Sequence, residues 1–374
     1  MGQLKGRAAA SRRRGKKEGG RRESSGGGEA WVQGAGMSSS TTSGQGQGDD
    51  APDLVCVVDC VHGMVDALSC VRWNKHQVSR QQPPPSPLFS SPLLRTRRLY
   101  LRAALHGMVV PQGAVVELSE HGIVVTVEES GCLQAKVYLK TELFAEYDYG
   151  AEGRPRFGLN LGLLVDCLNM FTVPGFASPV EIRYPGPDMQ LLLRSVGFPD
   201  ACIHAEIRTR IPDTVAWDYH FEHAGNTPVT FTVKSAILKE SIDDLEWPGS
   251  SIQIHFHPDP PSVIFKGEGH GDLEIEFSYY ANTALLIAFQ CDQELSYRYK
   301  YKFLRATTSN VPSSVLKENR GSKVTIGRGG MLKIQHLVSV ARLGTQSYHN
   351  FAGGAQQPSR IAFIEFFVKP EEDD

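Results

Sequence analysis

The chain has 374 residues, of which 41% are hydrophobic and 21% are charged, a balance typical of a soluble globular protein with room for two cores. No apolar run approaches the ~18 residues of a membrane span, and the N-terminus lacks the apolar stretch of a secretory signal. The formal net charge is −2, but residues 1–50 carry +4 and residues 78–113 carry +5, which leaves −11 for the rest. An acidic body argues against a strongly basic nucleic-acid-binding domain, so any contact with DNA must come from a local basic surface or from enclosure.

Residues 1–53 are rich in Gly, Ser and Arg and have almost no apolar periodicity, so we expect a disordered basic tail. The clusters Arg12–Lys17 and Arg21–Arg22 are typical of a nuclear-import signal or a loose phosphate-binding arm, and equally of a solvated extension. The seven cysteines are scattered and form no C-x-x-C pair. This favours reduced thiols in an intracellular compartment over a disulfide framework or a zinc site.

A short β-type run at 54–59 leads into apolar residues at helical spacing across 61–73. The pattern then breaks over 78–112, a stretch rich in Pro, Ser and Arg that has no acidic residue. Gln77-Val78 and Gln112 can be encoded by sequences that bound an intron, so one hypothesis is a retained intron at 78–112. The other is a genuine disordered loop, and in either case we assign no function to the arginines of this segment.

From residue 114 the chain is rich in short strands separated by turn residues. We predict strands at 114–118, 122–128, 132–138, 144–149, 157–161, 180–184, 189–195 and 201–207. Apolar residues between 163 and 171 take up a helical spacing. Residues 212–227 are expected to form a connector, along which Trp217, Tyr219 and Phe221 alternate.

A second half then restates the first, because residues 57–73 parallel 231–247 and residues 157–171 parallel 299–315. We predict its strands at 228–233, 251–257, 262–266, 273–279, 297–303, 324–327, 331–340 and 361–368, and helical stretches at 237–247 and 304–316. The sequence therefore predicts an α+β fold of two tandem β-α-β-β-β-α-β-β-β domains. We place the domains at 54–211, with a disordered insertion at 78–113, and at 228–374.

Three segments carry a resemblance to a known family: HGIVVTVEESGCLQAKVYLKTELFAEYDY (121–149), FGLNLGLLVDCLNMF (157–171) and IAFIEFFVKPEEDD (361–374). Together they resemble the Rad-one family of subunits of the 9-1-1 checkpoint clamp, a relative of the replication clamp PCNA. The resemblance implies a DNA-clamp fold with outer sheets and inner helices around a central hole. Two paralogous subunits would complete the heterotrimeric ring.

The resemblance further implies a nuclear, non-catalytic protein that a clamp loader places around double-stranded DNA at damage sites. There it would act as a platform for checkpoint and repair proteins, with no cofactor and no membrane contact. A clamp holds DNA by enclosure, so modest basic positions on the helices suffice. The candidates for these positions are Arg72, Lys75, Lys239 and Arg305, each of which is equally well explained as a solvated helix residue.

The resemblance also implies that the connector and an adjacent apolar groove are open to client peptides. Trp217, Tyr219 and Phe221 are therefore candidate partner anchors, or else they simply pack the connector onto the strands. The pair His255 and His257 lacks a third ligand nearby, so no metal site is expected.

Three alternative functions remain open. A 3'-5' exodeoxyribonuclease would need converging carboxylates, but Asp166, Asp243-Asp244 and Asp272 belong to different elements. A homotrimeric replication clamp and a β-rich adaptor that forms no ring are the other two.

Overall fold

The computed structural model describes residues between 51 and 372, with several gaps. The described ranges are 51–73, 112–173, 178–197, 203–212, 217–223, 227–246, 251–269, 271–279, 285–317, 320–340 and 360–372. Residues 1–50 of the predicted tail lie outside these ranges. The candidate Lys75 also lies outside them, as does all of the predicted insertion except Gln112 and Gly113.

Strands dominate the described chain, because apolar side chains alternate with polar ones over many short runs. In β4, Leu133–Lys140, the odd-numbered residues are buried while the even-numbered ones are at least partly exposed. The other strands of the first half are β1 Leu54–Val58, β2 Gly113–Ser119, β3 Gly122–Glu129, β5 Glu146–Tyr149, β6 Arg156–Asn160, β7 Val180–Tyr184, β8 Leu191–Ser195 and β9 His204–Ile207. Those of the second half are β10 Val229–Lys234, β11 Ser251–Pro258, β12 Pro261–Glu268, β13 Asp272–Ser278, β14 Leu286–Gln290, β15 Leu295–Lys300, β16 Gly321–Ile326, β17 Leu332–Ser339 and β18 Ile361–Val368.

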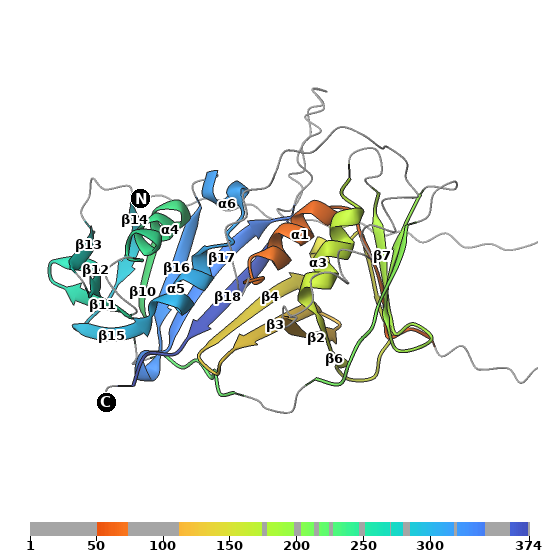
Figure 1. Cartoon of the computed structure of the whole chain (residues 1–374), viewed down its shortest axis with the longest axis horizontal. Helices are drawn as coiled ribbons and strands as arrows, with labels where there is room; N and C mark the ends of the chain where they lie inside the picture. Colours follow the sequence, from red (N-terminus) through yellow and green to blue (C-terminus); the bar gives the residue numbers. More distant parts are fainter. Residues whose placement is uncertain are drawn as a thin grey trace, which may run out of the picture. The chain divides into compact units, whose positions relative to one another are not determined.

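The strands form three sheets whose orders repeat (Figure 1). One sheet runs β5-β1-β7-β8-β9, and the second half contains the matching order β14-β10-β16-β17-β18. A four-stranded sheet runs β13-β12-β11-β15, and the first half contains the matching order β4-β3-β2-β6. The duplication predicted from the sequence is therefore present in the sheet topology.

The two halves are joined through backbone pairing of β4 with β18. These strands are antiparallel, with Tyr138 opposite Phe363 and Lys136 opposite Glu365. The pairing merges five strands of the second half and four of the first into one nine-stranded sheet. Each ladder hydrogen bond contributes only about 1 kcal/mol net, but an unpaired buried backbone group would cost more than that.

The helices cover the buried face of these sheets. They are α1 Val61–Ser69, α3 Leu161–Met170, α4 Ser235–Asp244, α5 Tyr301–Thr308 and the short α6 Ser313–Lys317. α1 packs beside α3 and α4 beside α5, while both α1 and α5 contact β18. α3 begins where the Asn160 side chain accepts a hydrogen bond from the backbone N–H of Leu163 at 3.2 Å. No helix in the described ranges is long and apolar enough to cross a membrane.

The structure corrects several predicted boundaries. Each half has five strands between its two main helices, where the predicted repeat has three. The strand predicted at 297–303 ends at Lys300, since Tyr301 and Leu304 already belong to the buried stripe of α5. The helix predicted across 61–73 ends at Ser69, and β14 was not predicted because its apolar run lacks alternation.

A buried polar network fixes α5 and α4 to the sheet of the second half. His336 on β17 is 1% exposed, with Nε2 2.8 Å from the Thr307 carbonyl oxygen of α5 and Nδ1 2.8 Å from Ser322 Oγ. A carbonyl only accepts, so the neutral ring carries its proton on Nε2. Ser322 Oγ in turn lies 2.8 Å from Ser235 Oγ at the start of α4.

Burial lowers the pKa of His336 from 6.5 to about 4, because the charged ring would lose its hydration. Between these values the unfolded chain binds the proton and the folded chain does not, so stability falls as the pH drops through this window. We expect the free energy of unfolding to decrease by about 2.5 kcal/mol between pH 7 and pH 4.5 from this group. Urea titrations of wild type and His336→Gln across this range measure the difference, and equal pH slopes for the two proteins would contradict it.

Candidate functional site

Arg72, the first basic candidate, lies in the turn after α1 and reaches across to α3. Its Nη1 is 2.8 Å from Asp166 Oδ1, and one third of its side chain is exposed. Its backbone carbonyl accepts a hydrogen bond from the Asn310 side chain, which follows α5. Arg72 therefore sits where helices of both halves meet, and its charge is already paired.

The two candidates of the second half are paired in the same way. Lys239 binds Asp243 one turn later on α4, and Arg305 on α5 binds Glu246, which follows α4. The Arg305 guanidinium also lies 5.9 Å from the centre of the Tyr301 ring. All three described candidates are thus partly exposed on the helix layer with a carboxylate beside them.

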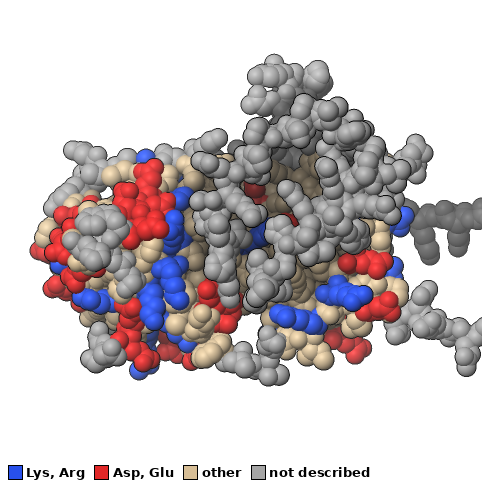
Figure 2. All heavy atoms as spheres, in the orientation of Figure 1, with Lys and Arg blue, Asp and Glu red and all other residues tan. Residues whose placement is uncertain are grey.

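This pairing makes the helix layer nearly charge-balanced. Figure 2 displays Lys and Arg side chains interspersed with Asp and Glu over the described surface of this view. Exposed ion pairs of this kind contribute at most about 1 kcal/mol each, so phosphate groups can compete for the basic partner. The arrangement suits loose contact with a polyanion and does not suit tight, base-specific binding.

The aromatic residues of the connector lie on the outer face of the nine-stranded sheet, on the side away from the helices. Tyr219 is 8% exposed, and its hydroxyl donates a hydrogen bond of 3.2 Å to Glu128 Oε1 at the end of β3. Burial, with the nearby Glu128 carboxylate, raises the pKa of Tyr219 far above its usual range. Phe221 contacts Phe367 of β18 at 6.2 Å between ring centres.

Trp217 differs from its two neighbours because 51% of it is exposed. One edge of its ring covers Gly131 in the turn between β3 and β4, and a Cβ atom at Gly131 would lie 2.9 Å from the ring. Gly131 also has φ +68°, which favours glycine. The outer edge of Trp217 is therefore available for a further contact, whereas the Tyr219 side chain is buried against the sheet.

A row of lysine–aromatic pairs, which the sequence reasoning missed, crosses the same outer face. Its members are Lys136 with Phe367 (5.7 Å), Lys140 with Phe363 (4.8 Å), Lys333 with Phe221 (4.4 Å) and Lys369 with Tyr219 (4.9 Å). Each distance joins Nζ to a ring centre and is within the range of a cation–π contact. The alternation of Lys136 and Lys140 along β4 and of Phe363 and Phe367 along β18 was the available signal, but it required knowing that β4 pairs with β18.

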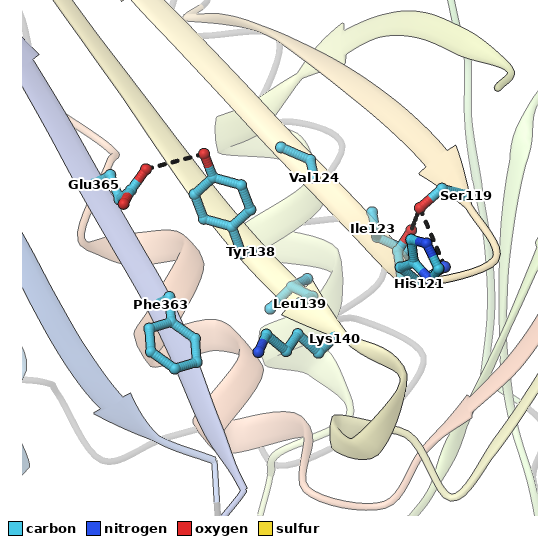
Figure 3. Close-up of a pocket in the computed structure, with 10 residues that line it drawn as sticks. Ser119, His121, Ile123, Val124, Tyr138, Leu139, Lys140, Phe363 and Glu365 are labelled. Atoms are coloured by element: carbon cyan, nitrogen blue, oxygen red, sulfur yellow. Dashed lines mark hydrogen bonds between the residues drawn. The ribbon is translucent and has the colours of Figure 1, made fainter. Parts of the chain in front are cut away.

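A cavity of about 360 Å³ lies on this face at the turn between β2 and β3 (Figure 3). Tyr138 and Phe363 line it, and Lys140 lies beside the Phe363 ring. The Tyr138 hydroxyl donates to Glu365 Oε2 at 3.0 Å, which closes one side. The lining is largely apolar and includes one lysine, Lys140, and one acid, Glu365.

The acidic and histidine candidates remain dispersed. Asp166 lies on α3, Asp243 on α4 and Asp272 on β13, so the structure does not bring the predicted nuclease carboxylates together. His255 and His257 stack at 6.2 Å. No group of three or more His, Cys, Asp or Glu side chains that could hold a metal occurs in the described part of the chain.

The arrangement of sheets and helices identifies the class of protein. The crystal structure of PCNA from Thermococcus kodakaraensis superposes with a TM-score of 0.55 at 12% sequence identity, covering 85% of this chain and 100% of that one. The chain therefore has the PCNA-like clamp fold that the family resemblance implies.

The particular family follows from the sequence comparison. Residues 89–338 match the family described as repair protein Rad1/Rec1/Rad17, and the chain belongs to this family. The match begins within the segment 78–112, and it ends before residues 361–374, which carry part of the resemblance seen in the sequence.

Individual relatives agree with this assignment. The cell cycle checkpoint protein RAD1 of Mus musculus is 26% identical over 268 residues, which cover 68% of this chain and 83% of the relative. That of Homo sapiens is 25% identical over 265 residues, covering 68% and 82%. The DNA repair protein Rad1 of Drosophila melanogaster is 24% identical over 259 residues, covering 68% and 85%.

The unequal burial of the connector aromatics leads to a prediction. Tyr219→Ala should lower the free energy of unfolding by roughly 2–4 kcal/mol, because a buried ring and its bond to Glu128 are lost. Trp217→Ala should cost about 1 kcal/mol or less, since half of the side chain is already in water. Urea denaturation of both variants measures this, and an equal or larger loss for Trp217→Ala would show that it too is a packing residue.

Proposed function

We propose that this chain is a non-catalytic subunit of a heterotrimeric checkpoint clamp that encircles double-stranded DNA at damage sites. Membership of the Rad1/Rec1/Rad17 family and the PCNA-like fold support the role of a clamp subunit. The names of the mouse and human relatives support the checkpoint assignment. A nuclear location is part of the proposal, and the basic clusters of residues 12–22 are consistent with it.

The observation that carries the ring is the set of end strands. β4 and β18 pair with each other, while their equivalents in the repeat, β13 and β9, are end strands that pair on one edge only among the described residues. An unpaired end strand can accept a strand from another chain. Because β9 and β13 differ, head-to-tail pairing through them generates a ring when the rotation closes.

Two domains follow naturally from this scheme. We propose residues 54–211 and 228–374 as the domains and 212–227 as the connector, each domain contributing one end strand to a neighbour. The two helix pairs, α1 with α3 and α4 with α5, would then line the hole. Arg72, Lys239 and Arg305 would meet the phosphates there, in exchange for their carboxylate partners.

The outer face supplies the platform for client proteins. Its exposed Trp217 edge, the lysine–aromatic pairs and the apolar cavity at Phe363 offer both apolar and basic contacts. We propose that checkpoint and repair proteins bind there through short segments. A clamp loader is the further partner that a closed ring requires.

Topological retention on DNA tests the function directly. The chain and its two sister subunits, loaded on a closed DNA circle by the matching clamp loader, should remain bound through a high-salt wash and be released when the circle is cut. The reason is that enclosure survives screening of charge, whereas phosphate contacts weaken steeply with salt. Gel filtration with light scattering should first give a 1:1:1 complex.

Two outcomes would contradict the proposal. Release from the closed circle in high salt would mean that the protein binds DNA by charge alone. Failure to form the 1:1:1 complex would rule out the proposed heterotrimer. A control with Arg72→Ala, Lys239→Ala and Arg305→Ala combined should still be retained on the circle, but should bind linear DNA with a weaker dependence on salt.

A further inference from the structure

The junction between β4 and β18 provides a template for how β9 and β13 would meet in a ring. Equivalent positions in the two halves follow from the strand-pairing registers. Leu161 and Tyr301, where β6 and β15 pass into helices, are one pair of equivalent positions. Two matching hairpins align β8 with β17. Their closing N–H groups, of Gly186 and Gly327, donate to the carbonyls of Gln190 and Met331. Counting from these anchors aligns β9 with β18 and β13 with β4.

At the internal junction the facing outer side chains are complementary. Lys136 lies opposite Glu365, and Gln134 lies opposite Phe367. Lys136 Nζ also lies 5.7 Å from the Phe367 ring centre, and Phe367 is 6% exposed. This side of the junction therefore combines opposite charge with a buried aromatic ring.

The two free end strands have a different chemistry at the same positions. On β13, Glu274 takes the place of Lys136 and Asp272 that of Gln134. On β9, His204 takes the place of Glu365 and Glu206 that of Phe367. If a second copy of this chain docked, Glu206 would lie directly opposite Asp272, and no buried ring would compensate.

The acidic character of β13 is only partly cancelled by nearby basic side chains. Asp272, Glu274 and Glu276 are all exposed on the same face, since they occupy alternate positions of the strand. Lys266 pairs with Glu274 at 3.3 Å but also with Glu268 at 3.2 Å. Like charges directly opposite across a strand pair are destabilising.

We propose that the opposed acids Glu206 and Asp272 disfavour pairing of the chain with itself and select, at β13, a clamp-type partner whose end strand carries a basic side chain opposite Asp272. The inference rests on the proposed ring and adds the chemistry of one partner to it. A homotrimer would place the Glu206–Asp272 contact at all three interfaces. A paralogous strand with Lys or Arg at the position of Glu206 turns the same contact into an attraction.

A charge-swap cycle on the full chain tests this. Glu206→Lys should tighten self-association about five- to tenfold, because a like pair becomes an opposite pair. Asp272→Lys should do the same from the other strand. The double variant, which again places like charges opposite each other, should return to the weak self-association of wild type.

Sedimentation equilibrium measures the association, and Glu152→Lys provides the matched control, because Glu152 is an exposed acid in the loop between β5 and β6. Thermal melting confirms that each variant is folded. Equal association of Glu206→Lys and Glu152→Lys, or a double variant as strong as the singles, would overturn the proposal. So would wild type that self-associates as tightly as Glu206→Lys.

The sister subunits separate this inference from the function on which it rests. If the ring is correct and the inference holds, Asp272→Lys should weaken assembly with the β13 partner about tenfold, whereas Glu152→Lys should not. Unchanged assembly of Asp272→Lys, together with a normal 1:1:1 complex of wild type, would overturn the charge selection and leave the clamp intact. Absence of any complex with wild type would instead contradict the clamp itself.

Discussion

Backbone pairing between β4 and β18 is the interaction on which the rest of the molecule depends. It joins residues that lie more than two hundred positions apart, as in the bond from Tyr138 to Glu365. It turns two repeated halves into one sheet, and it sets the helix pairs side by side, where Asn310 reaches the Arg72 carbonyl. Since the repeat has two copies of each strand and only one junction, it also leaves β9 and β13 as end strands.

The charged side chains of the helix layer, the outer face and the end strands differ in how they are paired. On the helix layer each described basic candidate has a carboxylate partner, which agrees with the proposed loose contact with enclosed DNA. The outer face instead pairs lysines with aromatic rings, and this is where we propose that client segments bind. The acids of β13 and Glu206 of β9 disfavour self-pairing, so that one pairing geometry can serve both inside the chain and between different chains.

Local patterns in the sequence predicted much of the fold. The alternation in β2 to β4 and the helical spacing of Leu164, Leu168 and Phe171 predicted these elements within one or two residues. Local patterns failed at Tyr301, where a period of two runs on into a helix, and at β14, where the apolar run has no period. The candidate site was harder to predict, because the partners of Arg72 and Lys140 come from distant segments. Spacing along the chain identified basic residues on helices, but it could not reveal that Asp166, Asp243 and Glu246 balance them.

Hydrogen–deuterium exchange tests the central claim most directly, because it reports which backbone N–H groups become paired. The chain alone and the chain with both sister subunits should differ in β9, His204–Ile207, and in β13, Asp272–Ser278, where new ladder bonds slow the exchange. Of the other end strands, β5 and β14 should exchange as before. Protection at β5 or β14 in place of β9 and β13, or no change at any strand, would contradict the account.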